Sequence, residues 1–167
     1  MAKRMKDTIK IYLASPLGFA ESTRDFMAIM ESRIAACGYT VINPWHLSNS
    51  QQFEVASLIE NSDERRQALH ELNMKVAAIN EKAIRECSVV VAVLDGPDVD
   101  SGTASEIGFA YAIGKQILGY RSDFRMASDN EGSLVNLQIE YWIESSGGCI
   151  VRNLDELCQE LAKASIE

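Results

Sequence analysis

The sequence has few basic residues and no long run of apolar ones. Lys and Arg number 16 against 24 Asp and Glu, which gives a formal net charge of −8 and an isoelectric point near 4.8. Nucleic acids and anionic membranes bind clustered Lys and Arg, so this balance argues against both as partners. No stretch approaches the roughly 18 consecutive apolar residues of a membrane-spanning helix. A small neutral or cationic ligand suits the composition better.

Histidine and cysteine are also scarce. His46 and His70 are the only histidines, and the 4 cysteines show no paired metal-ligand spacing. Metal sites and histidine-based catalytic triads are therefore poorly supported, and we expect no metal and no cofactor. Residues 1–7 lack the apolar core of a signal peptide, so we expect a cytoplasmic protein with reduced thiols.

The chain is long enough for one domain with a continuous core, and we expect residues 1–167 to form a single domain. Strands alternate with helical patterns, which predicts a flavodoxin-like three-layer α/β sandwich around a parallel sheet of about five strands. The loops 15–19 and 95–102 would then flank the switch point where such sheets bind ligands. The predicted strands are Thr8–Ala14, Tyr39–Asn43, Ser88–Leu94, Gln116–Tyr120 and Cys149–Val151.

Several helices and loops can be placed around these strands. Ser22 with Asp25 is a plausible helix cap, and Asn153 with Glu156 caps a last helix. A long helix, or two shorter ones, runs from about Asp63 to Glu86. We expect residues 44–48 to be a loop, residues 49–61 to be a loop with a short helix, and another short helix near residue 137.

The most informative segment is Asp95–Lys115, which leaves the apolar strand at residues 88–94, crosses an acidic glycine turn and enters a helix. Glu106 lies about one turn inside that helix, where the helix dipole favours an ionised carboxylate. A structural alternative is a capping box formed by Thr103 and Glu106. Asp95, Asp98 and Asp100 come before it at the end of a strand, and this cluster of like charges favours a functional site.

These residues resemble the nucleoside 2-deoxyribosyltransferase family. Its members share an Asp-x-Gly-Thr-Ala-x-Glu turn, a leading strand that ends near a tyrosine, and a later Asn-Leu pair. Here the three motifs are Asp100–Glu106, Ile11–Pro16 and the segment Asn136-Leu-Gln138. The resemblance extends from about residue 9 to residue 151, and the motifs are specific in combination rather than singly.

The resemblance implies double displacement at the anomeric carbon, within the salvage of deoxyribonucleosides. Glu106 would attack C1′ of a 2′-deoxynucleoside, release the base and hold the sugar as an ester until another nucleobase takes it. Tyr12 would hold Glu106 in line, although a strand tyrosine is more often plain core. Asp100 would bind a sugar hydroxyl and disfavour a 5′-phosphate. Asn136, with Gln138 beside it, would contact the sugar of a neighbouring subunit in a homo-oligomer.

The base site is predicted less clearly. Asn80 stands where some relatives carry an aspartate that helps to protonate the base, and an amide cannot deliver that proton. Asp95 is the fallback as a substrate contact and acid. Trp45 and Phe19 could stack on the base, or could be ordinary hydrophobic packing. Asp123 and Arg125 could pair with each other.

Rival functions differ in what they require. An N-glycoside hydrolase acting on nucleosides or nucleotides would use the same glutamate and pass the sugar to water. A phosphoribohydrolase would want a doubled glycine where this chain has Val99-Asp100. The fold alone would also allow a non-enzymatic flavodoxin-like module, because a fold does not determine a function. The strand end Ala14-Ser15 lacks the acid of a phosphoacceptor receiver, however, and no Gly-x-Gly-x-x-Gly motif supports a dehydrogenase. Purine or pyrimidine preference, ribose tolerance and oligomer size have no signal here.

Overall fold

The computed structural model describes residues 9–164, and their core is a five-stranded parallel sheet with the strand order β2-β1-β3-β4-β5. This is the flavodoxin-like α/β fold expected from the sequence. The first strand was predicted to begin at Thr8, which lies outside the described residues. The strands are β1 Lys10–Ala14, β2 Thr40–Ile42, β3 Val89–Val93, β4 Gln116–Tyr120 and β5 Ile150–Val151.

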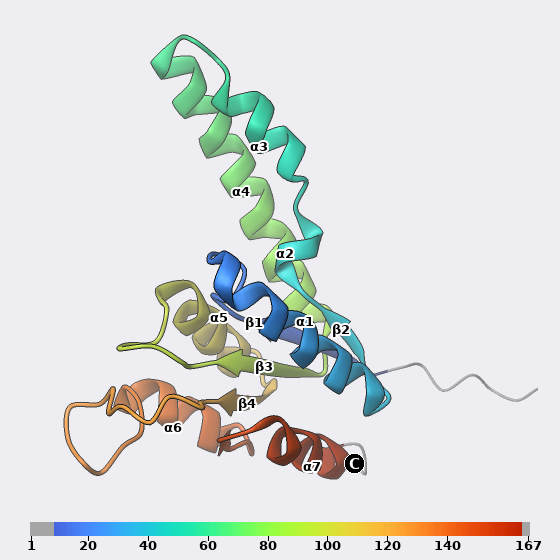
Figure 1. Ribbon diagram of the computed structural model, residues 1–167, viewed down its shortest axis with the longest axis vertical. Coiled ribbons are helices and arrows are strands. Elements are labelled where there is room, and N and C mark those ends of the chain that lie inside the picture. The colour runs from blue at the N-terminus through green and yellow to red at the C-terminus, as the bar shows by residue number, and fades with distance from the viewer. Residues whose placement is uncertain (1–8, 165–167) are drawn as a thin grey trace, which may run out of the picture.

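Helices cover both faces of the sheet and give the three layers (Figure 1). Because side chains alternate along a strand, β1 sends Ile11 and Leu13 to one face and Tyr12 to the other. Helices α1 and α7 pack on the first face, and α4, α5 and α6 pack on the second. The helices are α1 Glu21–Ala36, α2 Pro44–Leu47, α3 Ser50–Ser57, α4 Ser62–Glu86, α5 Ser101–Ala112, α6 Leu137–Ser145 and α7 Leu154–Ala164.

Two local predictions were wrong. Helix α1 is not capped by Ser22 and Asp25, because it begins at Glu21, and the cap residue is Ala20, which makes no side-chain hydrogen bond. The Thr23 hydroxyl instead donates to the carbonyl of Leu17 at 2.5 Å and ties the helix to the preceding loop. Residues 44–47 form helix α2 rather than a loop, since the Asn43 side chain caps it and the fixed φ of proline suits its first position.

Three other helix predictions were confirmed. The long helix is a single unbroken α4, since it contains no glycine or proline. Helices α3 and α6 lie where short helices were expected. At the start of α7, the Asn153 side chain accepts from the backbone N–H of Glu156 at 2.9 Å and donates to the Glu156 carboxylate at 2.7 Å. Asn153 and Glu156 thus cap the helix together, as expected from the sequence, and the Glu156 carboxylate also accepts from the backbone N–H of Arg152.

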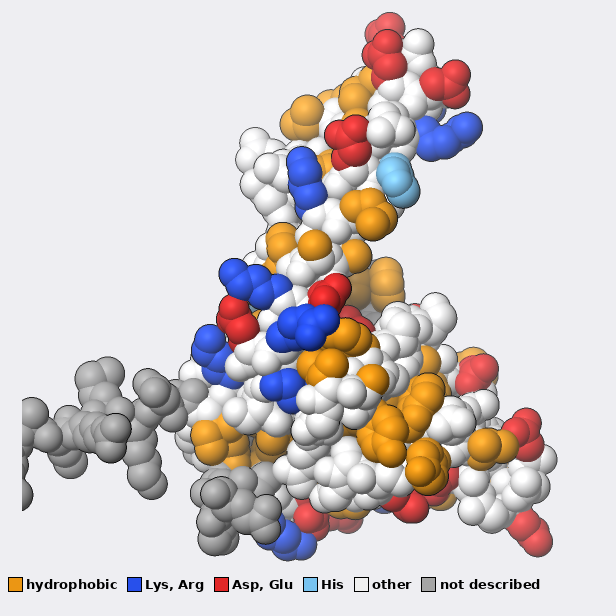
Figure 2. Space-filling view, turned by 180° about the vertical axis from the view of Figure 1, so that it is seen from behind, with side chains coloured by type: hydrophobic (Ala, Val, Ile, Leu, Met, Phe, Trp, Pro, Cys, Tyr) orange, Lys and Arg blue, Asp and Glu red, His pale blue; other side chains and the backbone are white. Residues whose placement is uncertain are grey.

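Helices α3 and α4 together form an arm that stands away from the body (Figure 1). Near its end α4 packs on the sheet through Ala83 and Ile84, whereas its upper part packs on α3. Several apolar side chains of the arm are exposed, including Val55, Leu58 and Met74. Acidic side chains lie at the tip of the arm (Figure 2). Within residues 9–164, no helix has the length and apolar character needed to cross a membrane.

Candidate active site

Tyr12 and Glu106 form the centre of the site. Tyr12 is fully buried in β1, and its hydroxyl donates a hydrogen bond of 2.6 Å to Oε1 of Glu106 in α5. The fold brings them together because β1 pairs with β3 in register, with Tyr12 opposite Val90, and α5 follows the loop after β3. The partnership that the family resemblance implied for these two side chains is therefore present in the structure.

The surroundings of the pair set its protonation. Burial raises the pKa of Glu106 to about 7, the Tyr12 hydrogen bond lowers it, and the negative charge of Asp100 raises it. Burial, followed by the adjacent Glu106 charge, raises the pKa of Tyr12 far above its usual range. Tyr12 therefore keeps its proton and acts as a donor, while Glu106 changes charge near neutral pH.

Asp100 is the residue that caps helix α5. Its Oδ2 accepts a hydrogen bond of 3.0 Å from the backbone N–H of Thr103. A Cβ atom on Gly102 would lie 3.0 Å from the same oxygen, so glycine leaves room for the capping carboxylate. The alternative capping box of Thr103 and Glu106 does not form, and the Glu106 carboxylate instead meets Tyr12.

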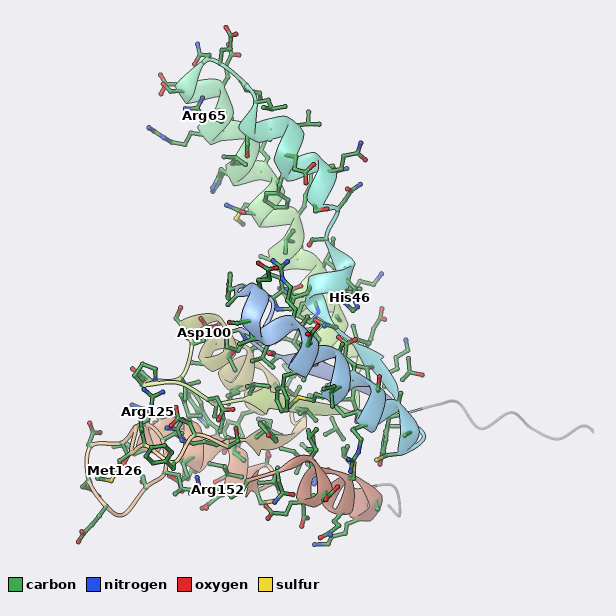
Figure 3. All side chains as sticks on the ribbon, viewed as in Figure 1. His46, Arg65, Asp100, Arg125, Met126 and Arg152 are labelled. Carbon is green, nitrogen blue, oxygen red and sulfur yellow. The ribbon has the colours of Figure 1, made fainter. Side chains whose placement is uncertain are left out.

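A cavity of about 240 Å³ opens beside this pair, where the arm meets the body. Figure 3 shows Asp100 and His46 at this junction. Asp100 and Glu106 are the only ionisable residues among those that line the cavity. The lining comes from the β1 loop, α2, α4 and α5 and comprises Ser15, Phe19, Pro44, Trp45, Ser48, Val76, Asn80, Asp100, Gly102, Thr103 and Glu106.

Asn80 presents an unused polar atom in this cavity. Its Oδ1 is buried and has no hydrogen-bond partner among the described residues. A buried carbonyl oxygen without a donor costs about 1–3 kcal/mol, so such atoms are uncommon in the absence of a ligand. Asn80 lines the same cavity as Glu106, and its orphan oxygen is therefore a candidate ligand contact.

Trp45 and Phe19 form the wall of the cavity opposite α4 and α5. The indole Nε1 of Trp45 donates to the carbonyl of Ser15 at 2.8 Å. Its ring lies directly on Gly18, where an added Cβ atom would come within 2.1 Å of the indole. Phe19 meets Trp45 edge-on at 4.6 Å between ring centroids and is 72% exposed. Trp45 is thus fixed, whereas the Phe19 ring has space around it.

Three predicted site residues lie away from this cavity. The Asp95 carboxylate accepts hydrogen bonds of 2.7–2.8 Å from both the backbone N–H and the hydroxyl of Ser122, and from the N–H of Asp123. It joins the loops after β3 and β4 and does not line the cavity, so it is badly placed to be the fallback acid. Asn136 caps α6 by accepting from the N–H of Gln138 at 3.0 Å, and Gln138 is exposed.

Arg121 is a structural residue that the sequence did not single out. Its side chain is almost wholly buried and donates to three backbone carbonyls, those of Leu94, Gly96 and Arg125. The guanidinium thereby joins the end of β3 to the loop after β4 and supports the segment that leads to Asp100. No local motif predicts this role, because two of the three acceptors, Leu94 and Gly96, lie more than 20 residues before Arg121 in the sequence.

The remaining charged candidates form ordinary contacts. Arg125 pairs with Asp123, as expected, and its guanidinium lowers the pKa of that carboxyl. His46 lies 3.9 Å from Glu31 at the surface, and His70 is exposed on the arm. Both histidines are therefore at surface positions, in agreement with the sequence.

Residues 11–138 match the family described as nucleoside 2-deoxyribosyltransferase. The chain belongs to this family. Among curated proteins, an uncharacterized protein of Schizosaccharomyces pombe is 37% identical over 60 residues, which are 34% of this chain and 28% of that protein. The match thus spans little more than a quarter of the length of that relative.

Several solved structures share the fold over nearly their whole length. A conserved protein from Enterococcus faecalis V583 has a TM-score of 0.70 at 23% identity, with 94% of this chain and 99% of that chain covered. A 2-desoxiribosyltransferase from Leishmania mexicana has a TM-score of 0.63 at 18% identity, with 93% and 97% covered. A CMP N-glycosidase from Clostridium botulinum has a TM-score of 0.54 at 19% identity, with 91% and 97% covered.

Proposed function

We propose that this protein transfers 2-deoxyribose between nucleobases by double displacement through Glu106. In the first step, a carboxylate oxygen of Glu106 bonds to C1′ while the C1′–N bond breaks, and the base leaves with the electron pair and takes up a proton. In the second step, a nitrogen of another base attacks C1′ while the C1′–O bond to Glu106 breaks, Glu106 departs as a carboxylate, and the incoming base loses its N–H proton to water. The hydrogen-bonded pair of Tyr12 and Glu106 at the cavity is the observation that carries this proposal.

Tyr12 positions the nucleophile and does not exchange its own proton. Its hydroxyl occupies Oε1 of Glu106, which leaves Oε2 for attack on the sugar. A hydrogen bond to a carboxylate also favours the charged form, so it offsets part of the cost of burying the glutamate. Glu106 must be ionised to attack, and we therefore expect activity to rise as the pH passes about 7.

The base is proposed to bind between Asn80 and the aromatic wall of Trp45 and Phe19. The unpartnered Oδ1 of Asn80 can accept an N–H from the base edge. Aromatic faces stack on purines and pyrimidines alike. Asp100 uses Oδ2 for its cap, and we assign Oδ1 to a sugar hydroxyl. Since Asn80 cannot supply a proton, the departing base would take one from water.

Asn136 is proposed to complete the site of a neighbouring copy. It lines a separate hollow with Pro97, Asp98 and residues 126–129, and it does not reach the Glu106 cavity of its own chain. Figure 3 shows Arg125 and Met126 on the loop near this hollow, away from the arm. Exposed apolar side chains lie in the segments that line it or adjoin them in sequence, namely Phe124, Met126, Leu137 and Tyr141. Such a patch suits a contact in a homo-oligomer.

Hydrolysis of the same N-glycosidic bond is the second candidate function. Glu106 is also reached from a hollow of about 380 Å³ between α4 and α5, and the cavity adjoins a larger open hollow at the base of the arm. Water can therefore approach C1′ from the side that the base has left, unless another base or a neighbouring copy excludes it. The shared fold with a CMP N-glycosidase is consistent with this alternative.

Incubation with deoxyinosine and free adenine tests the proposal. We expect deoxyadenosine and hypoxanthine in equal amounts from the wild-type protein, and neither product from the Glu106→Ala variant. Release of free deoxyribose without deoxyadenosine would reject the transferase and support the hydrolase. Near-normal turnover by Glu106→Ala would reject both. We place the activity in cytoplasmic nucleoside salvage, for which unpaired cysteines are suitable.

A further inference from the structure

The larger hollow next to the Glu106 cavity holds no part of the substrate in the transfer proposed above. Its volume is about 880 Å³, against about 240 Å³ for the cavity itself. The two share four lining residues, so they adjoin; these are Phe19, Trp45, Ser48 and Val76. We call this second hollow the distal chamber. It lies between the start of α1, α2 and the two helices of the arm.

Helix α4 runs along both the Glu106 cavity and the distal chamber, so its residues show how the two follow one another. Asn80 lines the Glu106 cavity, Val76 lines both spaces, and Asn73 lines the distal chamber alone. At about 1.5 Å per residue, Val76 lies about 6 Å and Asn73 about 10 Å along the helix from Asn80. A base held by Asn80, with its sugar at Glu106, would thus point its far edge past Val76 into the chamber.

The lining of the chamber favours an apolar or aromatic group near the base. Met27 is buried, Phe53 and Val76 are half-buried, and the fixed Trp45 ring forms a common wall. Most of the polar side chains that line the chamber are exposed to solvent, namely Arg24, His46, Ser50, Glu54 and Asn73, and Ser48 is half-buried. The position of Phe19 across both spaces, with its ring largely exposed, leaves the passage open to a substituent.

We propose that the distal chamber extends the base site and admits nucleobases that carry a bulky apolar substituent on the edge remote from the sugar. An aryl or alkyl group on the exocyclic amine of a purine has this shape. The inference rests on the proposed function, because it assumes that the base lies against Asn80. It also names a substrate class for which the cavity of about 240 Å³ would be too small by itself.

The test compares adenine with N6-benzyladenine as acceptors for the sugar of deoxyinosine. In the wild-type protein we expect kcat/KM values within about threefold of each other, because the benzyl group enters a preformed hollow. Asn73→Trp and Ser50→Trp fill the chamber from its two helical walls, and neither residue lines the Glu106 cavity. We expect each to reduce kcat/KM for N6-benzyladenine about tenfold or more, and that for adenine less than about threefold.

His70→Trp is the matched control, since His70 is exposed on α4 and lines neither space. It should leave both acceptors unaffected. The inference is overturned if the wild type transfers to adenine but rejects N6-benzyladenine, or if the two chamber variants affect both acceptors equally. These results leave the proposed function standing.

If adenine itself receives no sugar, the proposed function fails, and the distal chamber is then tested by measuring ligand binding instead of transfer. Calorimetry on the Glu106→Ala protein would then compare 2′-deoxyadenosine with its N6-benzyl derivative. The inference is supported if the derivative binds as tightly as 2′-deoxyadenosine or more tightly, and if adding Asn73→Trp weakens its affinity about tenfold. Failure of the derivative to bind, or no effect of Asn73→Trp, would overturn the inference.

Discussion

Replacement of Tyr12 by phenylalanine is the most direct test of how Glu106 is activated. The substitution removes one hydroxyl and its 2.6 Å hydrogen bond to Oε1, and it retains the buried ring. The bond lowers the pKa of Glu106, so its loss should raise that pKa above about 7. A hydrogen bond to a charged group contributes about 1.5–3 kcal/mol, which corresponds to about 1–2 pH units.

The assay is the pH dependence of kcat/KM for base exchange. In the wild type, the acidic limb reports ionisation of Glu106, and activity should increase through about pH 7. In Tyr12→Phe, the acidic limb should move upward by about 1–2 pH units, and activity at pH 7 should fall about 5-fold to 50-fold. Activity should recover partly at high pH, since the carboxylate is still present.

Tyr39→Phe is the matched control for this experiment. Tyr39 is also buried, and its hydroxyl donates to the backbone carbonyl of Leu161 at 2.5 Å on the other face of the sheet. Loss of that hydroxyl should affect stability without moving the pH profile. If Tyr12→Phe leaves the acidic limb in place, Tyr12 does not set the ionisation of Glu106, and our account of the pair is refuted.

Three further changes give distinct outcomes. Glu106→Gln should abolish exchange and stabilise the fold by roughly 1–3 kcal/mol at pH 8, as measured by urea unfolding. The raised pKa of Glu106 means that the buried carboxylate destabilises the fold increasingly between about pH 4.5 and 7. The gain in stability should therefore vanish near pH 4. Arg121→Met should cost about 3–5 kcal/mol by leaving three carbonyls unpaired, whereas the exposed Arg152→Met should cost less than about 0.5 kcal/mol. Gly18→Ala should displace Trp45, shift its fluorescence in a Trp142→Phe background and raise KM; an unchanged spectrum and KM would contradict the role given to this wall.

The five strands of the sheet were predictable because each strand carries a local signal. Residues 88–94 are a continuous β-branched run, and β3 occupies five of them with every residue buried. Helix α2 was missed although its start signal, Asn43 followed by Pro44, was present, because four residues give no apolar period. The arm could not be predicted from the sequence. The spacing of apolar residues predicts helix α4, but it does not show whether that helix lies on the sheet or stands away from it.

The site shows the same division. Tyr12, Asp100 and Glu106 could be placed because the motif fixes their spacing, and two adjacent parallel strands bring their ends to one edge. Asp95 stays a prediction as an acid, and the sequence could not show that its carboxylate meets a loop that follows a different strand. The distal chamber had no sequence signal, since its walls come from α1, α2, α3 and α4 and only the packed structure brings them together.

The cap of α5 explains how one acidic turn can serve both structure and chemistry. A carboxylate that caps a helix is occupied by the N–H that it accepts, whereas a buried carboxylate without that contact can face a substrate. Because Asp100 satisfies the first-turn N–H of Thr103, Glu106 is free to face Tyr12 and the cavity. Moving the cap to Glu106, as in the alternative considered from sequence, would remove the nucleophile. The charge of Asp100 then has a second consequence, since it raises the pKa of Glu106 and couples the cap to the pH at which Glu106 ionises.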